Sequence, residues 1–89
     1  MELYFRMSQF EKLLERFLKR PKDFTYNELK RLLSHYDYEE IQGRGSRVAF
    51  VNKANNNKIK VHRPHPSNIV KQDCLEDVEA QLRRKGLIK

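Results

Sequence analysis

The fold is decided by the stretch Arg47–His62, which reads RVAFVNKANNNKIKVH. At its start, Val48 and Phe50 alternate with polar or small residues, as in a strand with one buried face. At its end, Ile59 and Val61 alternate with lysines and a histidine in the same way. The three asparagines between the two runs tolerate the positive φ that a tight turn needs. The stretch therefore predicts a β-hairpin with one apolar face and one polar face.

Two helices are predicted upstream of the hairpin, at 8–20 and from 25 to about 35. Each begins with a capping box, in which Ser8 or Thr25 is followed three residues later by a glutamate. Leucines and aromatic residues then recur at helical spacing, and Pro21 ends the first helix. We interpret both apolar stripes as helix faces that pack into the hydrophobic core.

The rest of the chain adds one strand and one helix. Residues 38–42 form a short candidate strand before the hairpin. After it, Ser67 or Asn68 is expected to cap a last helix that ends at Gly86. The buried stripe expected on this helix consists of Val70, Cys74 or Leu75, Val78 and Leu82.

The element order α-α-β-β-β-α predicts an α+β fold, a two-layer sandwich in which helices cover one face of a three-stranded antiparallel sheet. The 89 residues are enough for one domain. We assign residues 8–89 to that domain, with 8–20 as an additional helix, and residues 1–7 to an N-terminal extension that contains a second possible start at Met7.

Positive charge is concentrated in the stretch Ile41–Gln72. It contains seven Lys and Arg residues and no Asp or Glu, so it accounts for the whole formal net charge of +7. Alternation along the last strand places Lys58, Lys60 and His62 together on the polar face. A segregated positive surface is typical of nucleic-acid binders, because each neutralised phosphate releases counterions. The alternative is a solvated basic face that only aids solubility.

Cysteine content and hydropathy indicate the compartment in which the protein is expected. The single cysteine, Cys74, excludes an internal disulfide and a cysteine-based zinc site and suits a reducing compartment. No apolar run approaches the roughly 18 residues that span a bilayer, and no signal peptide is visible. We therefore expect a cytoplasmic protein.

The chain resembles the HicA family of toxins from bacterial toxin–antitoxin pairs. The resemblance covers about residues 25–88 and is carried by Leu32-Leu33 and Tyr38, the loop Gly43-Arg44-Gly45-Ser46, the strand 58–62, His65-Pro66 and Gly86-Leu87. It implies a double-stranded-RNA-binding-domain-like fold, cleavage of messenger RNA (mRNA) by a ribonuclease without metal or cofactor, and neutralisation by a HicB-type antitoxin.

One departure from the family pattern concerns catalysis. Members typically carry a histidine shortly after Gly-Ser, whereas this chain reads Gly45-Ser46-Arg47-Val48. By spacing, the histidine position falls on Val48, and Arg47 precedes it. Arginine is not a general base at neutral pH, and valine has no acid–base chemistry. The family's catalytic residue cannot be transferred to this chain.

Metal-free RNA cleavage needs a base, an acid and a cation for the phosphorane charge. The candidates for the base and acid are His62 and His65, because histidine ordinarily titrates near pH 6.5. The predicted RNA-binding residues are Arg44, Ser46, Arg47, Lys58, Lys60 and Arg63. The two histidines, three residues apart, also allow a metal site, but no carboxylate or thiol lies within 41–72 to complete it. A non-catalytic RNA- or DNA-binding module and a protein-interaction subunit are the remaining alternatives.

Overall fold

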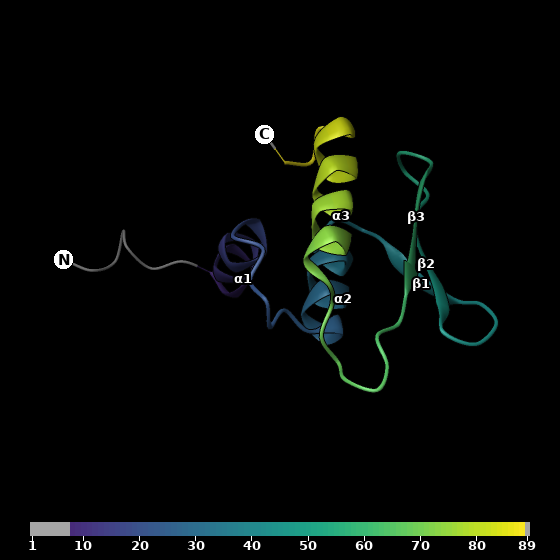
Figure 1. Cartoon of the computed structure of the whole chain (residues 1–89). Helices are drawn as coiled ribbons and strands as arrows, with labels where there is room; N and C mark the ends of the chain where they lie inside the picture. Colours follow the sequence, from purple (N-terminus) through teal and green to yellow (C-terminus); the bar gives the residue numbers. More distant parts are fainter. Residues whose placement is uncertain (1–7, 89) are drawn as a thin grey trace.

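Three helices and three strands form the computed structural model, which describes residues 8–88 (Figure 1). The N-terminal extension 1–7 and Lys89 lie outside the described residues. The elements in chain order are α1 (Gln9–Leu18), α2 (Tyr26–His35), β1 (Glu39–Gln42), β2 (Arg47–Asn52), β3 (Asn57–His62) and α3 (Gln72–Arg84). The α+β class and all six expected elements are confirmed.

Both predicted capping boxes are present, and they begin α1 and α2 where expected. The Ser8 hydroxyl accepts from the Glu11 backbone N–H at 3.0 Å, and the Glu11 carboxylate accepts from the Ser8 N–H at 2.9 Å. Thr25 and Glu28 repeat the pair at 3.1 and 2.9 Å. Each box gives partners to backbone donors that the first helical turn cannot satisfy itself.

The sheet is antiparallel, in the order β1-β2-β3. In β2 and β3, Val48, Phe50, Ile59 and Val61 are buried, as the alternation predicts. The hairpin turn contains Asn56 with φ of 57°, the left-handed conformation for which asparagine is suited. The register opposes Arg47 to His62 and Ala49 to Lys60, so these side chains share the face away from the core.

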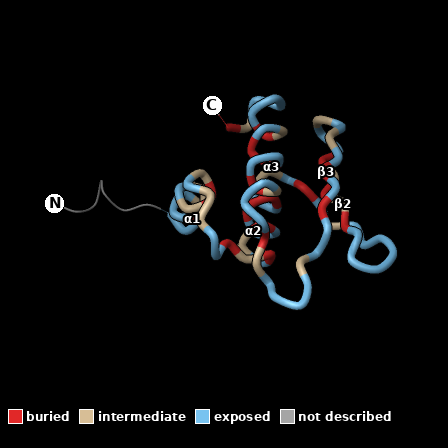
Figure 2. The backbone as a smooth tube through the Cα atoms, in the orientation of Figure 1, coloured by how far each residue is buried: buried red, intermediate tan, exposed pale blue. Residues whose placement is uncertain are grey.

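All three helices lie on one side of the sheet, and the buried residues gather between the layers (Figures 1 and 2). Helices α2 and α3 pack against the strands, whereas α1 packs on α2 away from the sheet (Figure 1). The two-layer sandwich thus carries α1 as an outer addition.

The predicted cap of the last helix is wrong. Helix α3 has Lys71 as its N-cap and no side-chain capping bond. The segment before it is instead held against the end of the α1–α2 linker and the first residue of α2, because the Tyr26 N–H donates to the Asn68 carbonyl and the Val70 N–H to the Phe24 carbonyl, both at 2.8 Å. These bonds keep residues 68–70 extended, so neither Ser67 nor Asn68 reaches a helix terminus.

The rest of the α3 prediction agrees with the structure, apart from one residue that precedes the helix. Leu75, Val78 and Leu82 are buried on α3, while Val70 is buried before its start. Cys74 is half-buried. Gly86 follows the helix with φ of 74°, as expected of a glycine that ends a helix.

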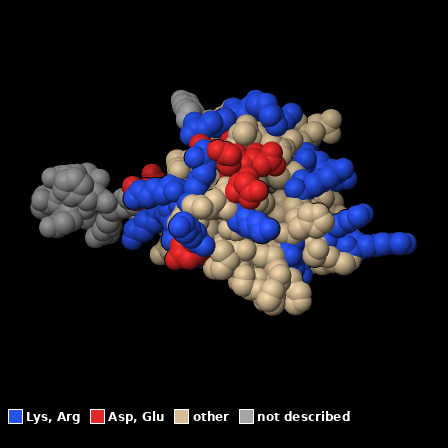
Figure 3. Space-filling model, viewed as in Figure 1, with Lys and Arg blue, Asp and Glu red and all other residues tan. Residues whose placement is uncertain are grey.

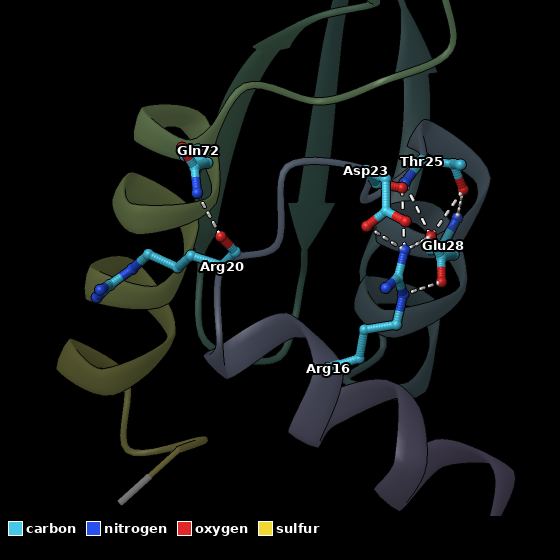
Figure 4. A network of polar contacts seen from close by, with 6 residues as sticks. All are labelled: Arg16, Arg20, Asp23, Thr25, Glu28 and Gln72. Atoms are coloured by element: carbon cyan, nitrogen blue, oxygen red, sulfur yellow. Dashed lines mark hydrogen bonds and ion pairs between the residues drawn. The ribbon is translucent and has the colours of Figure 1, made fainter.

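Polar side chains tie the helices together around the α1–α2 linker (Figure 4). Arg16 of α1 pairs with Glu28 at 2.7 Å and with Asp23 at 3.0 Å. The Gln72 side chain donates to the Arg20 carbonyl at 2.6 Å, which joins the start of α3 to the same linker. Within residues 8–88, no helix is long and apolar enough to cross a membrane.

Candidate nucleic-acid interface

The outer face of the sheet, which points away from the helices, carries the predicted basic cluster. We define it by the side chains Glu39, Ile41, Arg47, Ala49, Val51, Lys58, Lys60 and His62. An open groove of about 680 Å³ runs over it. Ile41 and Ala49 line the groove between the cations, and Ile41 is the one large apolar side chain within residues 8–88 that is exposed, at 51%.

Charge on this face is almost entirely positive. Arg47, Lys58 and Lys60 are all exposed, and the one carboxylate among the outer-face residues, Glu39, lies 3.8 Å from Lys53. Figure 3 shows Lys and Arg side chains along the side of the molecule that carries the sheet, and also over α1 and the end of α3, while a group of Asp and Glu side chains lies over α3. The outer face of the sheet is therefore basic, with a single carboxylate that is paired with Lys53.

The loop between β1 and β2 brings two further predicted residues to the end of the outer face. The Gly43 N–H donates to the Arg47 carbonyl at 2.8 Å, and the Arg47 N–H donates to the Arg44 carbonyl at 3.1 Å. Gly45 has φ of 61°, which side chains other than glycine rarely adopt. The tight turn leaves Arg44 and Ser46 exposed beside Arg47.

His62 is the candidate catalytic residue that the fold places inside this cluster. It is paired across the ladder with Arg47, and its Nδ1 lies 3.4 Å from the Ser46 hydroxyl. Which of the two groups donates depends on the imidazole tautomer. Val48, onto which the family histidine falls by spacing, is buried on the helix side. The exposed position at this end of β2 is therefore Arg47, directly opposite His62.

His65 lies in the connection from β3 to α3 rather than on the outer face. It is exposed, and no hydrogen bond or ion pair within residues 8–88 involves its ring. It lines a second cavity of about 580 Å³, together with His62, Lys71, Asp73 and other residues. The two histidines thus border one cavity, but only His62 also borders the groove on the outer face.

Arg63, predicted to bind RNA, is the member of the basic set that the fold separates from the rest. Its guanidinium lies 3.2 Å from the Glu40 carboxylate and 5.1 Å from the centre of the Tyr26 ring. Tyr26 belongs to α2, and Glu40 opposes the buried Phe50. Arg63 is therefore engaged on the helix side of the sheet.

The polar cluster that binds Arg63 was not predicted from the sequence. Glu40 accepts from the Tyr26 hydroxyl and also pairs with Lys30 at 3.2 Å. The hydrogen bond from Tyr26 lowers the pKa of Glu40 below its ordinary value. Burial, followed by the bond to Glu40, raises the pKa of Tyr26 to about 12. The signal in the sequence that could have predicted this cluster is Glu40, a glutamate at a strand position that faces the core.

Residues 8–88 contain no group of three or more His, Cys, Asp or Glu side chains that could hold a metal ion. Comparison with known proteins finds no family model, no curated protein and no solved structure that matches this chain. Evidence on the function therefore comes from the site itself and from the resemblance of its motifs to the HicA family.

Proposed function

We propose that this chain is a HicA-type toxin that binds RNA on the outer face of its sheet and cleaves mRNA without a metal. The observation that carries the proposal is the convergence of Arg47, Lys60 and His62 on one exposed face. Exposed cations on a flat sheet neutralise phosphates, and an imidazole among them is positioned for proton transfer at a bound phosphodiester.

His62 is the preferred general base. In cleavage by the neighbouring 2′-hydroxyl, the base removes the hydroxyl proton, the oxygen attacks phosphorus, and the 5′ oxygen leaves with a proton from an acid. Arg47 stands across the ladder from His62 and supplies positive charge for the phosphorane. His65, on the cavity that both histidines border, is the candidate acid.

The same surface suits the proposed partner. A HicB-type antitoxin that presents carboxylates to Arg47, Lys58 and Lys60 would cover the groove and exclude RNA from it, since charge complementarity governs both encounters. The single half-buried cysteine and the basic character agree with a cytoplasmic protein that meets mRNA there.

The deciding experiment is cleavage of a mixed mRNA by the purified protein in EDTA, with His62→Ala and His65→Ala beside it. We expect the wild type to cut and His62→Ala to lose at least about 100-fold in rate with an unchanged circular dichroism spectrum. Arg84→Ala, at the exposed end of α3, serves as the control and keeps full activity.

Absence of cleavage by the wild type, with salt-sensitive RNA binding intact, would identify a non-catalytic RNA-binding module instead. Equal activity of the wild type and both histidine variants would contradict the assignment of the base and the acid. A tight complex with an acidic partner, in a protein that neither binds nor cleaves RNA, would identify a protein-interaction subunit.

A further inference from the structure

The end of β3 is bound to its surroundings on both faces of the sheet. Arg47 and His62 form the last pair of the β2–β3 ladder. The next residue, Arg63, donates its backbone N–H to the Ser46 carbonyl at 2.7 Å. The last pair of a ladder is followed by no further strand pair. The position of His62 therefore depends on contacts made by the residue after it, such as the bond from the Arg63 N–H to Ser46.

The side chain of Arg63 supplies the contact on the helix side. Its Nη2 lies 3.2 Å from Glu40 Oε2, and the guanidinium stands over the Tyr26 ring. The Glu40 side chain is only 12% exposed and Tyr26 is 4% exposed, so this contact is made at the edge of the core. The Arg63 side chain itself is 42% exposed, but the charge-assisted bond from its planar guanidinium restrains the chain more than a solvated lysine does.

Tyr26 completes the contact from a third element. As the first residue of α2 it is fixed by the helix start, and its hydroxyl donates to the same Glu40 oxygen that Arg63 approaches. The three side chains therefore join α2, β1 and the end of β3 around one carboxylate. Lys30 pairs with the other Glu40 oxygen, at 3.2 Å, and touches no residue of β3 through that bond.

We infer that Tyr26 and Glu40 are positioning residues for His62, acting through Arg63. By anchoring the residue after His62, they hold the imidazole beside Ser46 and Arg47. The inference rests on the proposed function for its catalytic consequence. It also assigns Arg63 a role other than phosphate contact, because the guanidinium already has a carboxylate and an aromatic ring as partners.

The test compares Tyr26→Phe and Arg63→Lys with Lys30→Gln as a matched control. Tyr26→Phe removes one oxygen, and Arg63→Lys keeps the charge but loses the planar fork. Lys30→Gln removes a Glu40 partner that is not connected to β3. Each variant is measured by amide hydrogen exchange in the free protein, by steady-state RNA cleavage, and by the dependence of RNA affinity on salt.

We expect the exchange rate of the backbone amide at position 63 to rise about tenfold in both Tyr26→Phe and Arg63→Lys. The exchange rate of the Ile59 amide, in the middle of β3, should be unchanged. In both variants kcat falls by about 10- to 100-fold, while KM stays within about twofold, because misplacement of a catalytic group affects the chemical step. The salt slope is unchanged. Lys30→Gln matches the wild type in every measurement.

Unchanged exchange at Arg63 in both variants would overturn the inference. So would a salt slope reduced by about one with kcat intact, which is the result expected if Arg63 contacts a phosphate. If the wild type cuts no RNA, the proposed function fails, but the exchange measurement in the free protein still decides whether Tyr26 anchors the strand end.

Discussion

At the scale of single residues, Tyr26 shows how the core edge changes the chemistry of one side chain. Its phenol is buried and donates to an ionised carboxylate, so the neutral form is favoured twice. Glu40 in turn is kept ionised by three donors, of which the Tyr26 hydroxyl has the largest influence on its pKa. The two shifts are opposite in direction, as expected for a hydrogen bond that both groups share.

Tyr26 is expected to titrate at about pH 12, later than the ordinary tyrosine value of about 10. Because the folded pKa is the higher one, its contribution to stability is complete below about pH 10 and is lost as the pH rises towards 12. Titration of the ¹³Cζ resonance measures this directly. In Glu40→Gln the midpoint should move down; a midpoint that stays in place would contradict the role of the carboxylate.

Lys60 is expected to contact phosphate, since it is exposed on the outer face with Ala49 opposite. Lys60→Glu should weaken RNA affinity by about tenfold or more near 0.1 M salt, because at least one released counterion is lost. Filter binding measures the change. The control is Arg84→Glu, which alters the net charge equally at the end of α3 and should have little effect.

Equal losses in these two variants would mean that only the total charge matters. A loss of folding in Lys60→Glu, visible by circular dichroism, would contradict the assignment of Lys60 to an exposed face.

At the scale of elements, α3 differs from α1 and α2 in the way it begins. The first two helices have complete capping boxes, whereas α3 begins at Lys71 without a capping side chain. Its position is determined by the bonds of residues 68–70 to the α1–α2 linker and by the Gln72 side chain. Tertiary contacts thus replace the local signal that starts the other helices.

Lys71→Ser is therefore expected to stabilise the protein. Lys71 has φ of −68° and ψ of 149°, the extended conformation that an N-cap serine adopts. A cation at the N-cap is also unfavourable for the helix dipole, so its removal adds to the expected gain. We expect a gain of about 0.5–1 kcal/mol in the free energy of unfolding, measured by urea denaturation. Ser67→Ala is the comparison: Ser67 caps no helix, and its hydroxyl accepts an exposed 3.3 Å bond from the Ile69 N–H, so stability should change little. A loss of stability in Lys71→Ser would contradict the assignment of Lys71 as an unfilled N-cap.

At the scale of the whole molecule, the surface that stands out by its charge is the outer face of the sheet, where the one carboxylate, Glu39, is paired with Lys53. The outer face of the sheet and the β1–β2 loop present unopposed cations, while the acidic side chains on α3 and several near the α1–α2 linker are on other sides or in ion pairs (Figures 3 and 4). We therefore expect a polyanion to meet the sheet side of the protein first, because exposed cations outnumber carboxylates on that face.

RNA affinity should fall steeply with salt. If Arg44, Arg47, Lys58 and Lys60 each neutralise one phosphate, the log–log slope is expected near −4 for duplex RNA and near −3 for single strands. Titrations between about 50 and 200 mM salt measure it. A flat response would contradict the electrostatic argument as a whole, and a slope well beyond about −5 would mean that cations outside the outer face take part.

The sequence determined the secondary structure and the two faces of the sheet, because capping boxes, helical stripes and strand alternation are local patterns. It also placed Lys58, Lys60 and His62 on one face, since alternation depends only on neighbouring residues. Whether these residues bind or cleave RNA stays a prediction, because neither the fold nor the comparisons test it.

Only the tertiary structure decided which distant residues meet. The pairing of Arg47 with His62 follows from the hairpin register, and the removal of Arg63 from the basic set follows from a glutamate 23 positions away. The start of α3 likewise depends on bonds to a linker that precedes α2. Such contacts have no signature in local spacing, because they arise only when burial of the apolar faces brings separate elements together.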